Sequence, residues 1–386
     1  MEKLRPVIKR FKKVLPKFGV LAGCCLFLFT VNADAFEISG AEVTPSVSVS
    51  ESYDDNVSFA SHDTQSDFIT RISPAVNASY DAKDFKWDMY ADITQEMFSQ
   101  YSKFDNTSEN LRFNAAAELS KHDRISLSEK FSHTYEPANF DQAFARTLGR
   151  YSYYTNDITV EYIRDLTRQM SIHTSYANEL DLVSAEGMSD SVLNKLAVQL
   201  DYVFSASAAC STAVTIGRRD FDPGTHAEQL RWDAAVKYNF SRLTSVKFTA
   251  GLDDFITRPK DYVRPVFILA FEHEAGKKAE ASITLKKQYE LNSYSQELFD
   301  CWRASTFLNY RFTRKITAGA GLYYGEGTYV QSRIDETFIG SEAMFRYEPA
   351  KDTKIDCTYA YTQNTSNDAG REYTRNIFSL GVKREF

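Results

Sequence analysis

Cysteine is scarce in this sequence, and the few cysteines present do not form a recognisable motif. The 386 residues include 5 Cys, 9 Pro and 16 Gly. Cys24 and Cys25 lie together near the N-terminus, whereas Cys210, Cys301 and Cys357 are widely separated. No CxxC pair or Cys/His ligand spacing occurs, which excludes the usual zinc and thiol-redox motifs. We therefore expect isolated cysteines rather than a disulfide framework.

Long apolar runs and excess positive charge are also missing from most of the chain. The mean hydropathy of −0.40 argues against a polytopic helical membrane protein, in which each span needs about 20 mostly apolar residues. The net charge of −7 gives no indication of a nucleic-acid partner. In contrast, 23 Tyr and 28 Phe argue against disorder. A soluble β-rich protein and a membrane β-barrel both fit, because a barrel alternates apolar and polar side chains.

The one apolar run belongs to a predicted export signal. Basic residues are concentrated in 3–17, an uncharged and mostly apolar stretch covers 18–31, and Ala33–Ala35 has the small-x-small pattern of a cleavage site. This order of segments predicts a cleaved Sec-type signal peptide over residues 1–35. The mature chain would then be residues 36–386.

Apolar and polar residues alternate with a period of two along the mature chain. The pattern is clear in 85–98, 230–240, 280–286 and 354–361, and such alternation is typical of β-strands with two different faces. The predicted runs are about 10–15 residues long, whereas ordinary strands average about 5–6 and membrane-spanning strands need about 9–11. The pattern predicts an all-β protein with membrane-spanning strands.

Short polar turns alternate with longer polar stretches, which predicts a repeated hairpin. The turns begin 35–44 residues apart, and bacterial barrels place short turns in the periplasm and long loops outside the cell. The count predicts one domain, a transmembrane antiparallel up-and-down β-barrel of about 18 strands, or 16 if the region 181–190 or 137–154 is misassigned. The predicted long stretches are 54–66, 102–108, 137–148, 181–190, 221–228, 258–263, 292–299, 328–334 and 364–371.

Charged residues at alternate positions are predicted to face the lumen. An Arg or Lys facing lipid near the bilayer midplane costs about 2–4 kcal/mol, so these side chains should face water or one another. Both signs are interleaved, which predicts wall ion pairs and a polar lumen, and barrels of 16–18 strands keep that lumen open. Among the long stretches, Pro137–Leu148 is our first candidate for a constriction. The predicted lumen residues are Lys86, Asp88, Asp92, Glu96, Arg112, Lys195, Asp201, Arg231, Asp233, Lys237, Lys286, Arg303, Arg346, Lys354 and Asp356.

Aromatic residues mark the ends of many predicted strands. Tyr and Trp favour the membrane–water interface, where the ring is apolar and the polar atom is hydrated. The chain also ends in an aromatic residue, Phe386, at the close of an alternating stretch, which resembles the C-terminal signal that outer-membrane barrels present to the barrel assembly machinery. The aromatics next to the predicted turns are Tyr80, Tyr162, Phe204, Phe240, Phe312 and Tyr347.

Motifs for catalysis, metals and cofactors are missing. The six histidines show neither HxH nor HExxH spacing, and there is no GxSxG elbow or P-loop. His133, His173 and His273 lie in predicted strands near serines, where we expect them to fill polar positions or lie at the interface. We therefore expect no metal, no cofactor and no enzyme activity. An outer-membrane enzyme, which would depend on one of these histidines, is the alternative.

Two segments near the mature N-terminus carry a resemblance. Thr44–Val57 contains Tyr53-Asp54-Asp55-Asn56, and Ser66–Pro74 reads SDFITRISP. Asp and Asn are common turn formers. Together, however, the two segments resemble the opening hairpin of the outer-membrane β-barrel porins found with bacterial exopolysaccharide export systems. The resemblance implies polysaccharide-linked transport, with periplasmic export proteins and a polysaccharide as partners.

These observations predict a channel in the outer membrane of a Gram-negative bacterium. We expect a porin-like barrel with a polar lumen that serves as the outer-membrane exit of an exopolysaccharide secretion pathway. A general diffusion porin for small solutes and an outer-membrane lipid- or sugar-modifying enzyme are the alternatives. The expected partners are the outer-membrane lipid bilayer and the barrel assembly machinery, with no nucleic acid.

Overall fold

The computed structural model describes residues 35–386 except 138, 145–148, 186–187, 223, 258–260, 277 and 292–295. The predicted signal peptide, apart from its last residue, lies outside the described residues. Among the described residues, no helix is long and apolar enough to cross a membrane.

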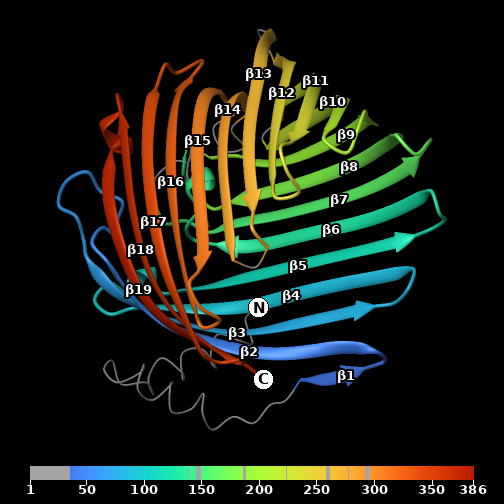
Figure 1. The fold of residues 1–386 in the computed structure, drawn as a ribbon. Helices are drawn as coiled ribbons and strands as arrows, with labels where there is room; N and C mark the ends of the chain where they lie inside the picture. The colour runs from blue at the N-terminus through green and yellow to red at the C-terminus, as the bar shows by residue number, and fades with distance from the viewer. Residues whose placement is uncertain are drawn as a thin grey trace.

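Eighteen long strands form a closed antiparallel ring, as the turn spacing predicts. Each strand from β2 to β19 pairs with its neighbour in the chain, and β19 pairs with β2 to close the ring (Figure 1). A short strand β1 (Phe36–Ile38) also pairs with β2 through a turn at Ser39 and Gly40, both with positive φ. The ring strands are β2 (Ala41–Asp54), β3 (Asp67–Asp81), β4 (Phe85–Phe98), β5 (Asn106–Glu118), β6 (Asp123–Thr134), β7 (Tyr153–Asp165), β8 (Met170–Val183), β9 (Asp190–Val203), β10 (Ala208–Asp222), β11 (Thr225–Asn239), β12 (Thr244–Thr257), β13 (Asp261–Glu274), β14 (Ala279–Leu291), β15 (Leu298–Arg311), β16 (Ile316–Tyr329), β17 (Asp335–Ala350), β18 (Thr353–Ser366) and β19 (Tyr373–Glu385).

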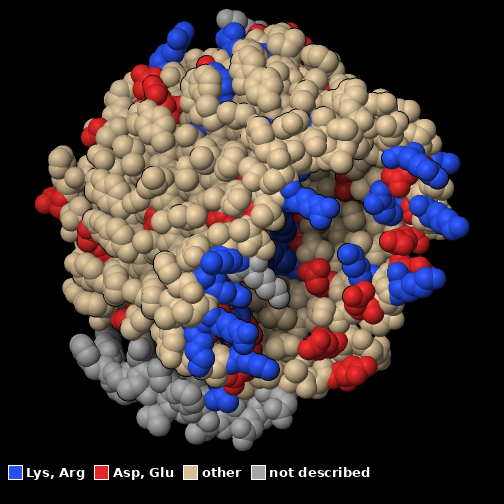
Figure 2. Space-filling model, viewed as in Figure 1, with Lys and Arg blue, Asp and Glu red and all other residues tan. Residues whose placement is uncertain are grey.

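The two faces of the sheet differ in chemistry. Directly paired residues lie on the same face, so the register assigns a face to each position around the ring. The face that carries Arg71 opposite Glu96 also carries Arg346 opposite Asp356, and it points inward. The other face carries exposed apolar side chains such as Phe68, which fits contact with lipid. In Figure 2 the visible outer wall is mostly tan, and charged side chains gather around the hollow.

Aromatic side chains form a repeated arrangement at the short-turn ends of the strands. Phe204, Phe240 and Phe312 are among the most exposed large apolar residues. Each packs edge-on against the Tyr two positions earlier, with ring centroids 4.8–4.9 Å apart. Exposed aromatic rings at a common level are typical of the interfacial girdle of a membrane barrel.

One predicted long loop, 221–228, is wrong, and a second, 258–263, is shorter than predicted because β13 begins at Asp261. The polar stretch 221–228 does not leave the sheet, because β10 continues to Asp222 and β11 begins at Thr225. Its polar residues instead extend the hairpin, with Asp220 paired to His226. Strand pairing can continue beyond the bilayer, where polar side chains on both faces are hydrated, so polarity alone does not mark the end of a strand.

Elsewhere the long connections lie at the end opposite the short turns, as predicted. The connection between β6 and β7, residues 135–152, contains the short helix α3 (Phe140–Ala143). Two further connections contain the 3-10 turns η1 (Ser102–Phe104) and η2 (Ala369–Arg371). By the rule for bacterial barrels, this end faces the outside of the cell.

Candidate functional site: a lumen narrowed by an inward loop

The register puts the predicted lumen residues on the same face of the sheet as the Arg71–Glu96 pair, and many of them form contacts along the wall. Arg346 makes two hydrogen bonds to Asp356, of 2.6 and 3.0 Å, and Arg231 lies 2.9 Å from Asp233. The wider set of contacts pairs Asp88 with Asn114, Asp92 with Asn110, Glu96 with Arg71, Arg112 with the Tyr90 ring, Asp201 with His173, Arg303 with Glu290 and Lys354 with Glu385. The inward wall is therefore lined with paired polar groups.

Other inward lysines have no ion-pair partner in the part of the chain that the structure describes. Lys195, Lys237 and Lys286 belong to this set, together with Lys247, which lies directly opposite Lys237. Lys86 likewise forms no ion pair with a described residue. These ammonium groups face the lumen between the wall residues that form ion pairs. The lining of the lumen therefore carries positive charges that are not in close ion pairs.

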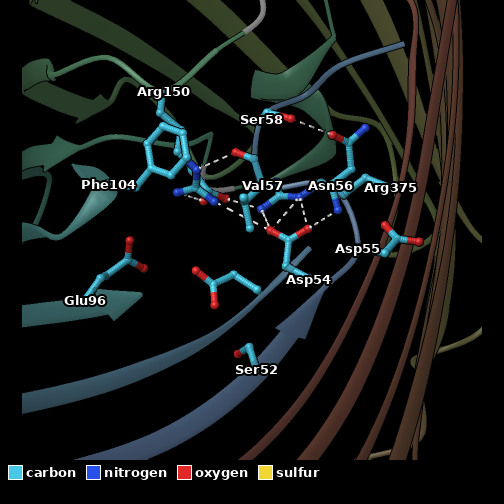
Figure 3. Close-up of polar contacts among 12 residues, drawn as sticks. Ser52, Asp54, Asp55, Asn56, Val57, Ser58, Glu96, Phe104, Arg150 and Arg375 are labelled. Carbon is cyan, nitrogen blue, oxygen red and sulfur yellow. Dashed lines mark hydrogen bonds and ion pairs between the residues drawn. The ribbon is translucent and has the colours of Figure 1, made fainter. Parts of the chain in front are cut away.

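We call the connection between β6 and β7 the constriction loop. Its helix α3 and Phe144 lie inside the ring, and Glu136 and Arg150, near its two ends, lie in a buried charge cluster. Arg375 of β19 makes hydrogen bonds to both carboxylate oxygens of Asp54, at 3.1 and 3.0 Å, and to Glu136 at 2.9 Å. Arg150 contacts Glu136, lies 3.6 Å from Asp54 and donates to the carbonyl of Val57. Figure 3 shows Arg375 and Arg150 at Asp54. Both ends of the loop are therefore held by ion pairs at the place where β19 pairs with β2.

A second pair completes this charge cluster, which we define as Asp54, Arg71, Glu96, Glu136, Arg150 and Arg375. Arg71 lies 2.5 Å from Glu96 and donates to Ser52 at 2.7 Å. The cluster contains three guanidinium groups and three carboxylates, so it is formally neutral. Buried charges need such partners because an unpaired one is strongly destabilising.

The residues that carried the sequence resemblance build this cluster and its surroundings. Asp54 is completely buried and pairs with Arg375. Asp55 accepts hydrogen bonds from the backbone and the side chain of Asn376, both at 2.7 Å. Asn56 donates to the carbonyl oxygens of Ala60 and Thr374. The Asp54-Asp55-Asn56 run therefore does more than form a turn. It also connects the loop between β2 and β3 to β19.

Farther along, the constriction loop docks on the opposite wall through two phenylalanines. The Phe144 ring lies 5.0 Å from Phe299 and 6.1 Å from Phe338, and the Phe140 ring lies 6.1 Å from Phe338. Facing glycines make room for these rings: a Cβ on Gly325 would lie 2.8 Å from Phe144. Since β15–β17 lie across the ring from β6 and β7, the loop crosses the lumen. Figure 1 shows α3 as a short green coil beside β15.

An open space remains beside the docked loop. A cavity of about 410 Å³ lies between Gln142 and Phe144 of the loop and the inward faces of β8 to β15, and a second of 230 Å³ adjoins it at Glu179, Leu193 and Lys195. The larger volume is comparable to pockets that hold small molecules. Its charged lining consists of Glu179, Lys195, Arg219, Glu228, Arg231, Asp253, Glu290 and Arg303.

The charge cluster predicts that acid will release the loop. Burial alone would raise the pKa of Glu136, but the guanidinium groups of Arg375, Arg150 and Arg71 outweigh it and lower that pKa to about 2. A depressed pKa means that the ionised form stabilises the docked loop. This stabilisation is complete above the ordinary value of 4.5 and is lost as the pH falls toward 2.

We therefore expect bilayer recordings to show one conductance level from neutral pH down to about pH 5, and larger, fluctuating currents below about pH 4. Glu136→Gln is the control, because an uncharged residue should give the fluctuating state at neutral pH with no further change on acidification. A wild-type conductance that is constant down to pH 2 would contradict the prediction.

Comparisons with known proteins agree with the fold. Residues 302–386 match the model of a family described as "Putative beta-barrel porin 2". No curated protein matches the chain. Among solved structures, OccK2 (OpdF) of Pseudomonas aeruginosa is 7% identical, the BenF-like porin of Pseudomonas fluorescens Pf-5 is 9% identical, and OccAB4 of Acinetobacter baumannii is 10% identical. Each has a TM-score of 0.50, with 89% of this chain covered and 98–99% of the other chain.

The closed ring, its apolar outer face and the match of residues 302–386 to a β-barrel porin family show that the protein is a porin-like β-barrel of the bacterial outer membrane. Its metal-ligating residue types form no group that could hold an ion among the residues described. Cys210, Cys301 and Cys357 are free, in agreement with the expectation of isolated cysteines.

Proposed function

We propose that this barrel is a passive channel whose conducting path runs beside the docked constriction loop, and that it serves as the outer-membrane exit of an exopolysaccharide pathway. The observation that carries the channel is the loop itself, which crosses a polar lumen and leaves about 410 Å³ open on one side. Transport is then diffusion or guided passage, and any driving force comes from periplasmic partners.

Two features of the chain support a carbohydrate as the transported molecule. The opening hairpin resembles that of porins found with exopolysaccharide export, and its Asp54–Asn56 run builds the charge cluster. The lumen also presents aromatic rings next to polar groups: Tyr90 lies 5.0 Å from the Arg112 guanidinium, and Phe307 is 39% exposed on the inward face. Sugar rings combine apolar faces with hydroxyl groups. Aromatic rings can stack on the apolar faces, and the neighbouring polar groups can form hydrogen bonds with the hydroxyl groups.

The two parts of this proposal are tested separately. Refolded protein in planar bilayers is expected to conduct, and a folded barrel that shows no current would overturn the channel. In the native host, deletion of the gene is expected to retain polymer in the periplasm, and the wild-type gene should restore its release.

A general diffusion porin is the second candidate, because both signs of charge are interleaved along the lumen. It predicts a different result in the same strains. Uptake of small solutes would fall on deletion, and polymer release would be unchanged.

A further inference from the structure

Three polar side chains on the outward face of the barrel are arranged as a nucleophile, a base and a carboxylate. The Oγ of Ser152 lies 3.0 Å from Nε2 of His133, and Nδ1 of the same imidazole is hydrogen-bonded to Glu109. Glu109 and His133 are directly paired residues of β5 and β6, and Ser152 immediately precedes β7. A hydroxyl on one imidazole nitrogen and a carboxylate on the other is the geometry of serine hydrolases.

The position of this trio on the barrel indicates its substrate. It lies on the face that carries the exposed Ile93, directly opposite Glu109, and at the extracellular end of the strands. The Tyr154 ring stacks on His133 at 3.9 Å and 2° and is itself exposed. Exposed aromatic rings at strand ends mark the level of the lipid headgroups. His133 is buried and Ser152 is partly exposed, so the hydroxyl lies where a lipid ester can approach it.

The other histidines of the described chain do not have this arrangement. His173 faces the lumen, and carboxylates approach both of its nitrogens: Glu161 at 3.1 Å and Asp201 at 2.9 Å, while Ser171 is 3.4 Å away. His273 contacts Thr244 through Nδ1. Only the outward trio combines a close hydroxyl with a carboxylate on the far nitrogen.

We propose that Ser152 and His133 are the catalytic residues of an esterase that cleaves acyl esters of outer-leaflet lipids, with Glu109 as the positioning residue. The Ser152 oxygen attacks the ester carbonyl carbon while its proton passes to Nε2 of His133. The carbon–oxygen bond to the alcohol breaks, and the imidazolium returns the proton to the departing oxygen. Water then gives a proton to His133, attacks the acyl-Ser152 ester and releases the fatty acid as Ser152 regains its proton.

The test uses the refolded full barrel in vesicles of phosphatidylethanolamine and phosphatidylglycerol with labelled acyl chains. We expect wild-type protein to release fatty acid and Ser152 to be labelled by a fluorophosphonate. Ser152→Ala and His133→Asn should each lower the rate by at least about 10³-fold. Glu109→Gln should lower it by about 10²–10⁴-fold. Glu109→Asp, which keeps a carboxylate beside the imidazole, should restore part of the rate that Glu109→Gln loses, a rescue that a merely structural role would not give.

Matched controls separate catalysis from folding. Ser171→Ala and His173→Asn change the same residue types on the inward face and should leave hydrolysis unchanged. Heat-modifiable gel migration shows that each variant is folded. Equal rates for wild type and folded Ser152→Ala, or no hydrolysis by folded wild type, would overturn the proposal. Hydrolysis confined to an O-acetylated polysaccharide would overturn the lipid assignment. Ser152→Ala should conduct like wild type, so this test is independent of the channel.

Discussion

Deletion of residues 137–148, with a short Gly/Ser linker in their place, is expected to raise the single-channel conductance severalfold. The ring has 18 strands, and barrels of 16–18 strands leave an aqueous lumen unless a segment fills it. Here the filling segment is the constriction loop, since Phe140 and Phe144 cross to β15–β17. Planar-bilayer recordings of the refolded deletion protein measure the effect, and an unchanged conductance would show that the loop does not limit the current.

A single substitution tests the docking without removing the loop. In Gly325→Ala, the new Cβ would lie 2.8 Å from carbon atoms of the Phe144 ring, so the ring must move away. We expect a conductance between those of the wild type and the deletion protein. Gly319→Ala is the matched control, because Gly319 is an inward glycine of the same strand. A Cβ added at Gly319 would lie 3.3 Å from the Leu308 carbonyl oxygen and 3.5 Å from the end of the Met344 side chain. It should leave the conductance unchanged.

The barrel was predictable because its signals are local. Period-two alternation assigns a face to each residue, and turn residues recur at regular intervals, so strand number and facing follow without any long-range contact. The stretch Pro137–Leu148 was the first candidate for a constriction because of its length, and that role stays a prediction, although Phe140 and Phe144 of this stretch do pack on Phe338 and Phe299. Its docking surface was not predictable, because Gly325 and Gly340 in the sequence give no sign that two phenylalanines lie against them.

The charge cluster shows why the rest of the site could not be predicted. Glu96 was in the predicted lumen set, but Arg71, Glu136, Arg150 and Arg375 were not. Asp54 and Arg375 are 321 positions apart and meet only because the last strand pairs with the first. Of the Ser152–His133–Glu109 trio, only His133 could be singled out from the sequence, as one of three strand histidines near serines. The members of the trio come from three different segments, and the strand register brings them together without any sequence motif.

Arg375→Gln is expected to have the largest effect of any single substitution at the candidate site. The Arg375 guanidinium bonds to both oxygens of the fully buried Asp54 and to Glu136. Removal of one partner of a buried ion pair leaves an uncompensated charge and costs about 3–5 kcal/mol. We expect this penalty to undock the constriction loop, which raises the conductance and lowers the temperature at which the barrel unfolds on heat-modifiability gels.

Arg346→Gln provides the matched control for this prediction. Arg346 also makes two hydrogen bonds to a carboxylate on the inward face, but its side chain and that of Asp356 are 35% and 31% exposed. Solvent screens such a pair, so its loss should cost less than about 1 kcal/mol and leave the conductance unchanged. Asp54→Asn combined with Arg375→Gln removes the stranded carboxylate charge. The double variant should therefore be more stable than Arg375→Gln alone, and additive losses would show that the two residues do not act as a pair.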